Sequence, residues 1–508
     1  MNLIPVIGLE IHVQLKTKSK MFCACSNQGE YEAPNVTICP VCTGQPGTLP
    51  TLNAAALRMG LKAGKALGCR IPDRAKFDRK NYFYPDLPKG YQISQFDLPV
   101  AIDGTLEIEV HDKDATRPVA KIGIIRAHLE EDAAKLTHLE SGTSTVDYNR
   151  AGTPLLEIVT APDFTSPAEA KAFLTELRAI MRTIGVSDAD MEKGHLRCDA
   201  NISLRRMEDD GTPQDKTLNP KVEVKNLNSF RSVERALEYE IMRQEKLYLS
   251  NTPPATDSTR GWNDAKGMTV EQRSKESAKD YRYFPEPDLP ALDLTALRDE
   301  VVLPELPVAK RARLALEYGL APADARTLVE DPLAVDFFEN AMSELRAWLE
   351  ALPENEGTRE ELWDENKTKL AKLASGWFIS KLWGLMAETH VTMKNLKIDP
   401  ENFAEFITLV YTNKVNSTSA QKILASMLEL GKDPSQVMED EGLGQIADTD
   451  TLAPIVERIV RENPKMADDY RAGKVQVLKS LLGLMMKATE GRAHPKVTEE
   501  LLKLHLEH

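Results

Sequence analysis

The sequence predicts an α+β protein in which a sheet-containing N-terminal part is followed by an all-helical C-terminal part. Up to residue 295, segments that alternate apolar and polar residues are mixed with amphipathic helical segments, without the strand–helix rhythm of a doubly wound sheet. Beyond that point only helical spacing recurs. We therefore expect a sheet domain over residues 1–295, a helical connector over 296–398 and a helical tail over 399–508.

The composition is that of a globular protein. The 508 residues are 42% hydrophobic and 28% charged, which provides enough apolar material for several cores. No apolar run reaches the roughly 18 residues of a membrane span, and the N-terminus lacks the basic start of a signal peptide, so we expect a cytoplasmic protein. The formal net charge of −14 argues against general nucleic-acid binding, so any contact with RNA requires locally concentrated basic residues.

Four of the six cysteines form two close pairs, Cys23 with Cys25 and Cys39 with Cys42. Prolines and glycines mark the span 23–42 as loop and turn, so the four thiolates can surround one metal ion, as in a small zinc ribbon. A reducing compartment disfavours disulfides. We expect a structural Zn²⁺, with four free thiols as the alternative. Cys69 and Cys198 have no spaced partner and are interpreted as ordinary small residues.

Residues 77–95 combine five aromatic residues with basic, amide and acidic side chains. Pro85 and Pro88 remove two backbone donors and Gly90 permits a turn, which argues against a helix. Loops of this composition often carry functional sites. The alternative is a surface loop whose aromatic side chains pack into a core.

Four segments alternate as strands that have one apolar and one polar face. They are residues 6–15, 121–131, 197–205 and 221–225. Their polar faces carry Glu10, His12 and Gln14; Arg126, His128 and Glu130; Arg197, Asp199, Asn201, Ser203 and Arg205; and Lys221, Glu223 and Lys225. A solvated face is ordinary in an antiparallel sheet, but mixed acidic and basic faces on four strands also fit one shared catalytic floor.

Helices are predicted between and after these strands. Ser166 to Glu169 has the sequence of a capping box with proline at the first helical position, and this helix should end at Gly185. A second helix is predicted from Val233 to about Leu249. Further helical patterns lie near 304–319, 332–352, 361–389, 400–414, 417–431, 451–463, 474–489 and 496–506.

The C-terminal tail contains a local set of basic residues within an acidic chain. They are Lys474, Lys479, Lys487, Arg492, His494 and Lys496. Such a stripe on a helical module can contact RNA phosphates, whereas a solvated helix face is the simpler interpretation.

Six motifs occur in order along the N-terminal part. They are GLEIHV at 8–13, the 77–95 segment, EEDA at 130–133, GTPLLEIV at 152–159, LRCDANI at 196–202 and DYRYFPEPD at 280–288. Together they resemble the B-subunit family of the bacterial tRNA-dependent amidotransferase that acts on Asp-tRNA(Asn) and Glu-tRNA(Gln). The resemblance implies an antiparallel-sheet cradle like that of glutamine synthetase, polar strand faces joined into one site, and a helical tail that contacts tRNA.

The resemblance also implies the chemistry. ATP phosphorylates the side-chain carboxylate of a misacylated Asp-tRNA(Asn) or Glu-tRNA(Gln), and ammonia then displaces the phosphate. Mg²⁺ prefers oxygen ligands, and the candidates are Glu10, Glu130 or Glu131, Glu157 and Asp199, with His12 as an additional ligand or hydrogen-bond partner. Strand parity favours Glu130 as a ligand, the resemblance favours Glu131, and both stay candidates. The cations expected to offset phosphate charge are Arg79, Lys80, Lys89, Arg197 and Lys225.

No G-x-x-x-x-G-K-[S/T] loop and no amidase or glutaminase motif is present, so ATP needs another kind of site and ammonia needs another source. The resemblance implies an amidase A subunit as that source and a small C subunit, with Lys80 and Lys89 lining the ammonia path. A non-discriminating aminoacyl-tRNA synthetase is a further candidate partner. The alternatives are a tRNA-binding scaffold without catalysis and the archaeal Glu-tRNA(Gln)-specific relative, whose inserted domain finds no room here. The sequence distinguishes neither the tRNA species nor glutamine from asparagine as donor.

Overall fold

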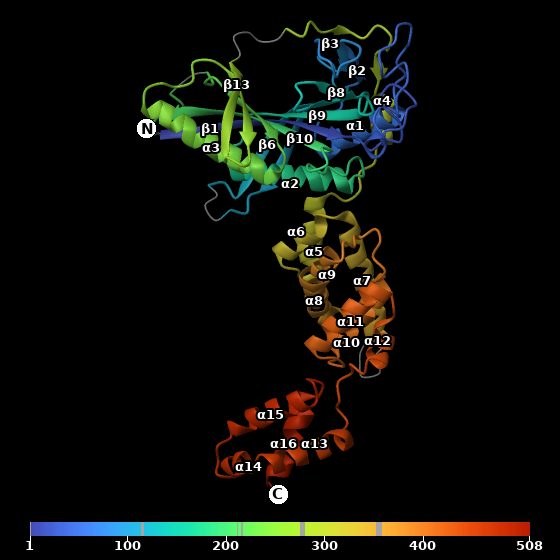
Figure 1. Ribbon diagram of the computed structural model, residues 1–508, viewed down its shortest axis with the longest axis vertical. Helices are drawn as coiled ribbons and strands as arrows, with labels where there is room; N and C mark the ends of the chain where they lie inside the picture. The colour runs from blue at the N-terminus through green and yellow to red at the C-terminus, as the bar shows by residue number, and fades with distance from the viewer. Residues whose placement is uncertain are drawn as a thin grey trace. The chain divides into compact units, whose positions relative to one another are not determined.

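The computed structural model confirms the α+β class. It describes residues 2–112, 116–210, 212–214, 217–274, 280–351 and 358–507. The chain divides into two compact units, Met1–Pro307 and Val308–His508. All described strands belong to the first unit, and the described secondary structure of the second is helical apart from an isolated β-bridge between Ile446 and Ala493 (Figure 1). No described helix combines the length and the apolar character that a membrane span requires.

An eight-stranded sheet forms the centre of the first unit, in the order β13-β12-β11-β10-β1-β9-β6-β5. The strands are β1 (Asn2–Gln14), β5 (Ala101–Glu109), β6 (Val119–Glu131), β9 (Pro154–Thr160), β10 (Leu196–Met207), β11 (Val222–Leu227), β12 (Ser258–Asn263) and β13 (Met268–Ser274). All four strands predicted by alternation are present. Neighbouring strands pair antiparallel except β11 and β12, which are parallel. The sheet is therefore mixed, whereas the family resemblance implied an antiparallel sheet.

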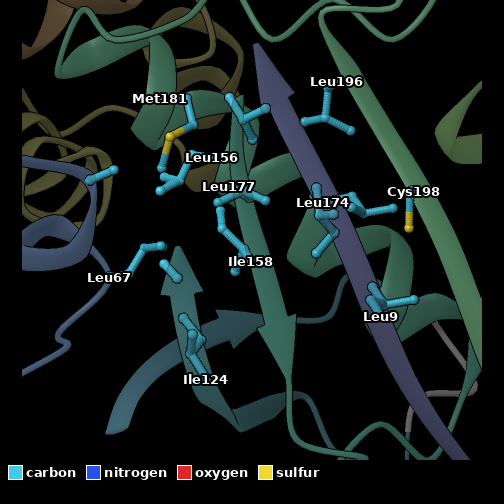
Figure 2. Packing of buried hydrophobic residues seen from close by; sticks show 14 of the residues in the cluster. Leu9, Leu67, Ile124, Leu156, Ile158, Leu174, Leu177, Met181, Leu196 and Cys198 are labelled. Atoms are coloured by element: carbon cyan, nitrogen blue, oxygen red, sulfur yellow. The ribbon is translucent and has the colours of Figure 1, made fainter. Parts of the chain in front are cut away.

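Helices cover the apolar face of this sheet. They are α1 (Ala54–Ala66), α2 (Pro167–Thr183) and α3 (Phe230–Leu249). Figure 2 shows Leu174 and Leu177 of α2 packed among Leu9 of β1 and Leu156 and Ile158 of β9. Because strand residues alternate, burying this apolar face leaves the polar residues of the same strands on the opposite face.

The start of α2 differs in detail from the predicted capping box. Ser166 accepts a hydrogen bond from the backbone N–H of Glu169, as expected. The Glu169 carboxylate, however, accepts from the N–H of Thr165 at 2.7 Å and from Arg117. In a full capping box the Glu169 carboxylate would accept from the N–H of Ser166. Here that hydrogen bond is replaced by these contacts, which include an ion pair with Arg117 in the segment before β6.

Helix α1 is not among the predicted helices, and its two internal glycines explain why. Gly60 and Gly64 lower helix propensity, yet a Cβ at Gly64 would lie only 2.6 Å from the Cβ of Ala101 in β5. The glycine lets the helix approach the sheet closely. Tertiary packing here outweighs local propensity.

The 77–95 segment forms a hairpin of β3 (Asp78–Asn81) and β4 (Tyr91–Ser94), as its proline and glycine content suggested for a non-helical segment. Strand β14 (Phe284–Pro285) joins it in a three-stranded sheet of order β14-β3-β4. Two further two-stranded sheets complete the unit. They pair β2 (Arg74–Ala75) with β15 (Leu292–Asp293) and β7 (Lys135–His138) with β8 (Ser144–Asp147).

The first unit extends beyond the boundary expected after residue 295. Helix α4 (Thr295–Glu300) belongs to it, and Leu297, Val301 and Leu306 pack against the core of the sheet. The segment that follows the last strand is thus anchored to the first unit by apolar contacts.

The second unit contains the helices α5 to α16. They are α5 (Pro307–Tyr318), α6 (Pro322–Val329), α7 (Pro332–Ala351), α8 (Arg359–Trp377), a π-helical turn (Phe378–Leu382), α9 (Trp383–Glu388), α10 (Pro400–Tyr411), α11 (Ser417–Leu430), α12 (Pro434–Asp440), α13 (Thr449–Glu462), α14 (Pro464–Arg471), α15 (Val477–Ala488) and α16 (Pro495–Glu507). One hydrophobic cluster runs from Leu314 to Leu443 and another from Leu452 to Leu506. The domain boundary expected between residues 398 and 399 falls inside the first cluster, which contains both Ile398 and Phe403.

Candidate active site and metal centres

Strand register brings the polar faces of β1, β6, β9 and β10 together. His12 of β1 lies opposite Arg197 of β10 on one side and Glu157 of β9 on the other. Glu157 in turn lies opposite His128 of β6. Residues from four strands that are far apart in the sequence thus form one polar surface, on the face of the sheet that the helices leave uncovered.

Three side chains of this polar surface form a compact group, those of His12, Glu130 and Glu157. The Nε2 atom of His12 lies 3.4 Å from Glu130 Oε1 and 3.4 Å from Glu157 Oε2, and the two carboxylates are only 3% and 10% exposed. Two buried carboxylates repel each other unless a cation lies between them. One imidazole and two carboxylate oxygens within 4.8 Å of one another are a donor set that suits a divalent cation. We call this group the carboxylate–histidine cluster.

The electrostatics of the cluster fit that interpretation. Burial by itself lowers the pKa of His12, but hydrogen bonds to Glu130 and Glu157 outweigh burial and raise the pKa to about 10. Burial likewise opposes ionisation of Glu130, yet hydrogen bonds from His12 and His128 keep its pKa below the usual range. The protonated imidazole of His12 therefore places a positive charge beside the two carboxylates. A metal ion bound there would provide the same kind of charge.

His128 was not among the predicted site residues, although strand parity put it on the correct face. Its Nε2 atom lies 3.2 Å from Glu157 Oε2, and its side chain is buried. Ser94 of β4 donates to Glu130 Oε2 at 3.1 Å. His128 and Ser94 therefore hold the two carboxylates in position.

A hollow of about 470 Å³ opens beside the cluster. Its lining includes six of the predicted side chains, His12, Lys80, Glu130, Arg197, Asp199 and Lys225. Two of the cations in it, Arg197 and Lys225, are held by carboxylates. Arg197 lies 2.7 Å from Asp132, and the ammonium of Lys225 lies 2.6 Å from Asp199 and 3.0 Å from Glu223. Asp132, which the sequence reasoning missed, also lies 3.5 Å from Arg150 at the edge of the hollow.

Three predicted residues line a second cavity instead. Glu131 follows Glu130 in β6 and so points to the other side of the strand, where its carboxylate lies 2.6 Å from Lys89 Nζ and accepts from the N–H of Ile93. Arg79 forms a two-point ion pair with Glu286, at 2.7 and 2.9 Å. Arg79, Lys89 and Glu131 line a second cavity of about 220 Å³, bounded by the cysteine-bearing loop. These three side chains do not line the hollow beside the carboxylate–histidine cluster, because neighbouring strand residues such as Glu130 and Glu131 face opposite ways. Their roles as metal ligand and phosphate-binding cations stay a prediction.

Glu10 lies on the same face as His12 but one step further along β1, opposite Asp199. Its carboxylate accepts from Asn201 Nδ2 at 3.0 Å. It borders a third hollow of about 380 Å³, whose lining mixes polar groups with the exposed apolar side chains of Ile125 and Leu218. Glu10 and Asp199 are therefore outside the three-residue cluster, although Asp199 lines the hollow beside it.

The four predicted cysteine ligands converge. The sulfur atoms of Cys23, Cys25, Cys39 and Cys42 lie within 4.8 Å of one another. A hydrogen bond from Cys23 lowers the pKa of Cys42 to about 4. Lys20, which is fully buried, has its ammonium 3.8 Å from this sulfur and 3.3 Å from the carbonyl oxygen of Tyr148. The donor set is compatible with a structural zinc ion.

The basic residues of the tail do not share one environment. Lys479, Lys487 and Lys496 are exposed. Lys474 is exposed too, but its ammonium lies 2.8 Å from Asp469. Arg492 is half-buried and donates to the carbonyl oxygen of Gly442 at 2.7 Å, so it holds together two parts of the helical unit.

Comparison with known proteins agrees with this architecture. Residues 5–298 match the family described as the GatB/GatE catalytic domain, and residues 360–506 match the family described as the GatB domain. Both the sheet unit and most of the helical unit are therefore covered.

Full-length relatives agree as well. The B subunit of the aspartyl/glutamyl-tRNA(Asn/Gln) amidotransferase of Thermomicrobium roseum is 45% identical over 504 residues, which cover 98% of this chain and 97% of that protein. The corresponding protein of Thermoanaerobacter pseudethanolicus is 43% identical and that of Dehalococcoides mccartyi 44%, each over 99% of this chain and 98% of the relative. This chain therefore belongs to the family of B subunits of the aspartyl/glutamyl-tRNA(Asn/Gln) amidotransferase.

Proposed function

We propose that this chain is the activating subunit of a glutamine-dependent carbon–nitrogen ligase. It transfers the γ-phosphoryl group of ATP to the side-chain carboxylate of misacylated Asp-tRNA(Asn) or Glu-tRNA(Gln), which releases ADP. Ammonia then attacks the activated carbonyl carbon, phosphate leaves and an amide remains. The observation that carries this proposal is the buried carboxylate–histidine cluster beside a hollow whose lining includes the cations Lys80, Arg197 and Lys225.

Glu130, Glu157 and His12 would hold Mg²⁺. When bound, Mg²⁺ neutralises charge on the phosphate oxygens of ATP. Arg197 and Lys225 are held in place by carboxylates, so they can stabilise the charge of the transferred phosphoryl group without reorganising, and Lys80 adds a further positive charge to the lining. Each such preorganised group is typically worth about 10²–10³ in rate.

The hollow that borders Glu10 is the best candidate for the nucleoside of ATP. Ile125 and Leu218 are each 52% exposed there, which supports an apolar clamp for a flat base, and Asn201 offers amide groups. Glu10 is two residues from His12 on the same face of β1. A nucleotide in this hollow could therefore extend its phosphates toward the carboxylate–histidine cluster.

Ammonia would come from a partner, and the second cavity is the candidate route. The small sheet β14-β3-β4 separates the two spaces, with Lys80 and Gln92 toward the hollow and Arg79 and Lys89 in the second cavity. The Lys89–Glu131 ion pair involves the residue next to Glu130 in β6. This arrangement supports an amidase A subunit that delivers ammonia through the second cavity, with a small C subunit as third component.

Two supporting sites complete the proposal. The four cysteines hold a structural Zn²⁺ that orders the loop at the second cavity. The exposed lysines of the tail, Lys479, Lys487 and Lys496, contact phosphates of the tRNA, and Lys474 and Arg492 contribute after exchange of their present partners. A non-discriminating aminoacyl-tRNA synthetase that supplies the misacylated tRNA is a further partner.

The test is reconstitution with A and C subunits of the family. Phosphate release and amide formation are measured with each misacylated tRNA, with ATP and with glutamine or asparagine as donor. Phosphate release that requires misacylated tRNA and is abolished by Glu157→Ala and by Glu10→Ala supports the proposal. A complex that binds tRNA but releases no phosphate would identify the chain as a scaffold.

A further inference from the structure

Four aromatic rings lie together next to the hollow, and we call them the aromatic rim: Tyr82, Phe96, Tyr281 and Tyr283. The ring of Phe96 stacks on that of Tyr283 with centroids 4.3 Å apart and planes 11° from parallel. Tyr281 meets Tyr82 and Tyr283 edge to face, at 6.0 and 6.2 Å. None of the four belongs to the hydrophobic clusters found among the described residues, and Phe96 is 48% exposed.

The rim lies on the hollow side of the small sheet. Tyr82 lines the hollow with Lys80. Phe284 pairs with Arg79, whose side chain lines the second cavity, so Tyr283, one residue earlier, faces the side of Lys80. The ammonium of Lys80 lies 5.1 Å from the centre of the Tyr281 ring. The same cation thus contacts the rings and lines the hollow beside the carboxylate–histidine cluster.

We propose that the aromatic rim binds the unpaired 3′-terminal nucleotides of the aminoacylated RNA, with the terminal base stacked on its rings. This inference rests on the proposed function. Partly exposed aromatic rings combined with a cation are the usual platform for single-stranded nucleic acid, because every base offers a flat face. The opposite end of the polar surface, at Glu10, offers the apolar hollow suited to the nucleoside of ATP. The aminoacyl group therefore approaches from the rim, where the base next to the ester is held outside the hollow.

The test uses the full-length chain and a short RNA hairpin that ends in an unpaired CCA sequence. The terminal adenosine is replaced by 2-aminopurine, whose fluorescence falls when it stacks on an aromatic ring. Tyr283→Leu should reduce this quenching and weaken binding about 5- to 150-fold. Phe284→Leu is the matched control, since Phe284 is the neighbouring aromatic residue on the other face of the same sheet. Tyr283→Phe should retain the quenching, because it keeps the ring.

Equal quenching in Tyr283→Leu and Phe284→Leu overturns the proposal. Equal affinity for hairpins with and without the terminal CCA also overturns it. Tyr281→Leu provides a second measurement at the rim if Tyr283→Leu unfolds, which its thermal melting curve reveals. The measurement requires no turnover, so a wild-type chain that quenches the probe but forms no amide would contradict the proposed function and leave the rim in place.

Discussion

Glu130 and Glu131 are consecutive residues of β6 whose carboxylates lie in different environments. Glu130 lies 3.4 Å from His12 in the carboxylate–histidine cluster, and Glu131 lies 2.6 Å from Lys89 in the second cavity. We expect Glu130→Gln to weaken divalent-cation binding and to lower tRNA-dependent phosphate release about 100-fold or more. Glu131→Gln should leave phosphate release within a few-fold of wild type. Calorimetric titration with Mn²⁺ and a phosphate-release assay compare the pair, and equal losses would contradict the assignment.

Lys89 and Lys80 form a second matched pair. The family resemblance implied that both lysines line the ammonia path, but Lys80 lines the hollow and Lys89 the second cavity. We now expect Lys89→Ala to be the uncoupling variant, because it alters the ammonia route. Lys80→Ala should lower both activities together. The ratio of phosphate released to amide formed, measured with glutamine and again with added ammonium, separates the two outcomes.

Asn226 interrupts the alternation of β11. It adopts a left-handed conformation, φ 62°, where β11 has one residue more than β10: Ala200 pairs with Val224 and Cys198 with Leu227. Val224 and Leu227 both stay buried, while Lys225 and Asn226 line the hollow. We expect Asn226→Gly to retain phosphate release, since glycine accepts this conformation. Asn226→Ala should lower it about tenfold or more by displacing Lys225 from Asp199.

Asn251 provides the control for that prediction. It has a similar φ of 58° beyond the end of α3, away from the hollow. Asn251→Ala carries the same backbone strain, about 1 kcal/mol, and should lower thermal stability as much as Asn226→Ala without lowering activity. Parallel losses of activity in both alanine variants would mean that the bulge has no positioning role.

Metal removal tests the cysteine cluster. A strong chelator should release one zinc ion per chain and lower the melting temperature, because a structural metal contributes to folding. Lys20→Met should speed that release, since it removes the buried ammonium 3.8 Å from Cys42. Cys69→Ala is the control, as Cys69 is a buried cysteine outside the cluster. Zinc content by elemental analysis and a colorimetric chelator assay provide the measurements.

The Arg117–Glu169 ion pair predicts a dependence of stability on acid. Burial alone would raise the pKa of Glu169, but the hydrogen bonds from Arg117 outweigh it, and the pKa lies below the usual 4.5. The folded state thus binds this proton more weakly than the unfolded state. The pair stabilises the fold above pH 4.5, and this contribution is lost as the pH falls below that value. Glu169→Gln should cost about 2 kcal/mol at pH 7 and flatten the melting temperature between pH 3 and 5. An unchanged acid profile would contradict this origin.

Local patterns predicted much of the fold. Alternation located β1, β6, β10 and β11, a capping sequence with proline located α2, and helical spacing located α10 and most later helices, because these signals depend only on neighbours in the chain. Short helices such as α6 and α12 were missed, since eight and seven residues carry too little periodicity. Helix α1 was missed because its glycines are explained only by contact with β5.

The sequence by itself determined which face of each strand is polar and that four cysteines could share one ion, since both follow from spacing along the chain. Tertiary structure alone decided which polar faces meet. The register of β1 against β9 and β10 brings His12 to Glu157, while the small sheet separates Lys80 from Arg79 and Lys89. Pairing between distant strands depends on the whole packed core, and a shift by one residue would turn every one of these side chains to the other face.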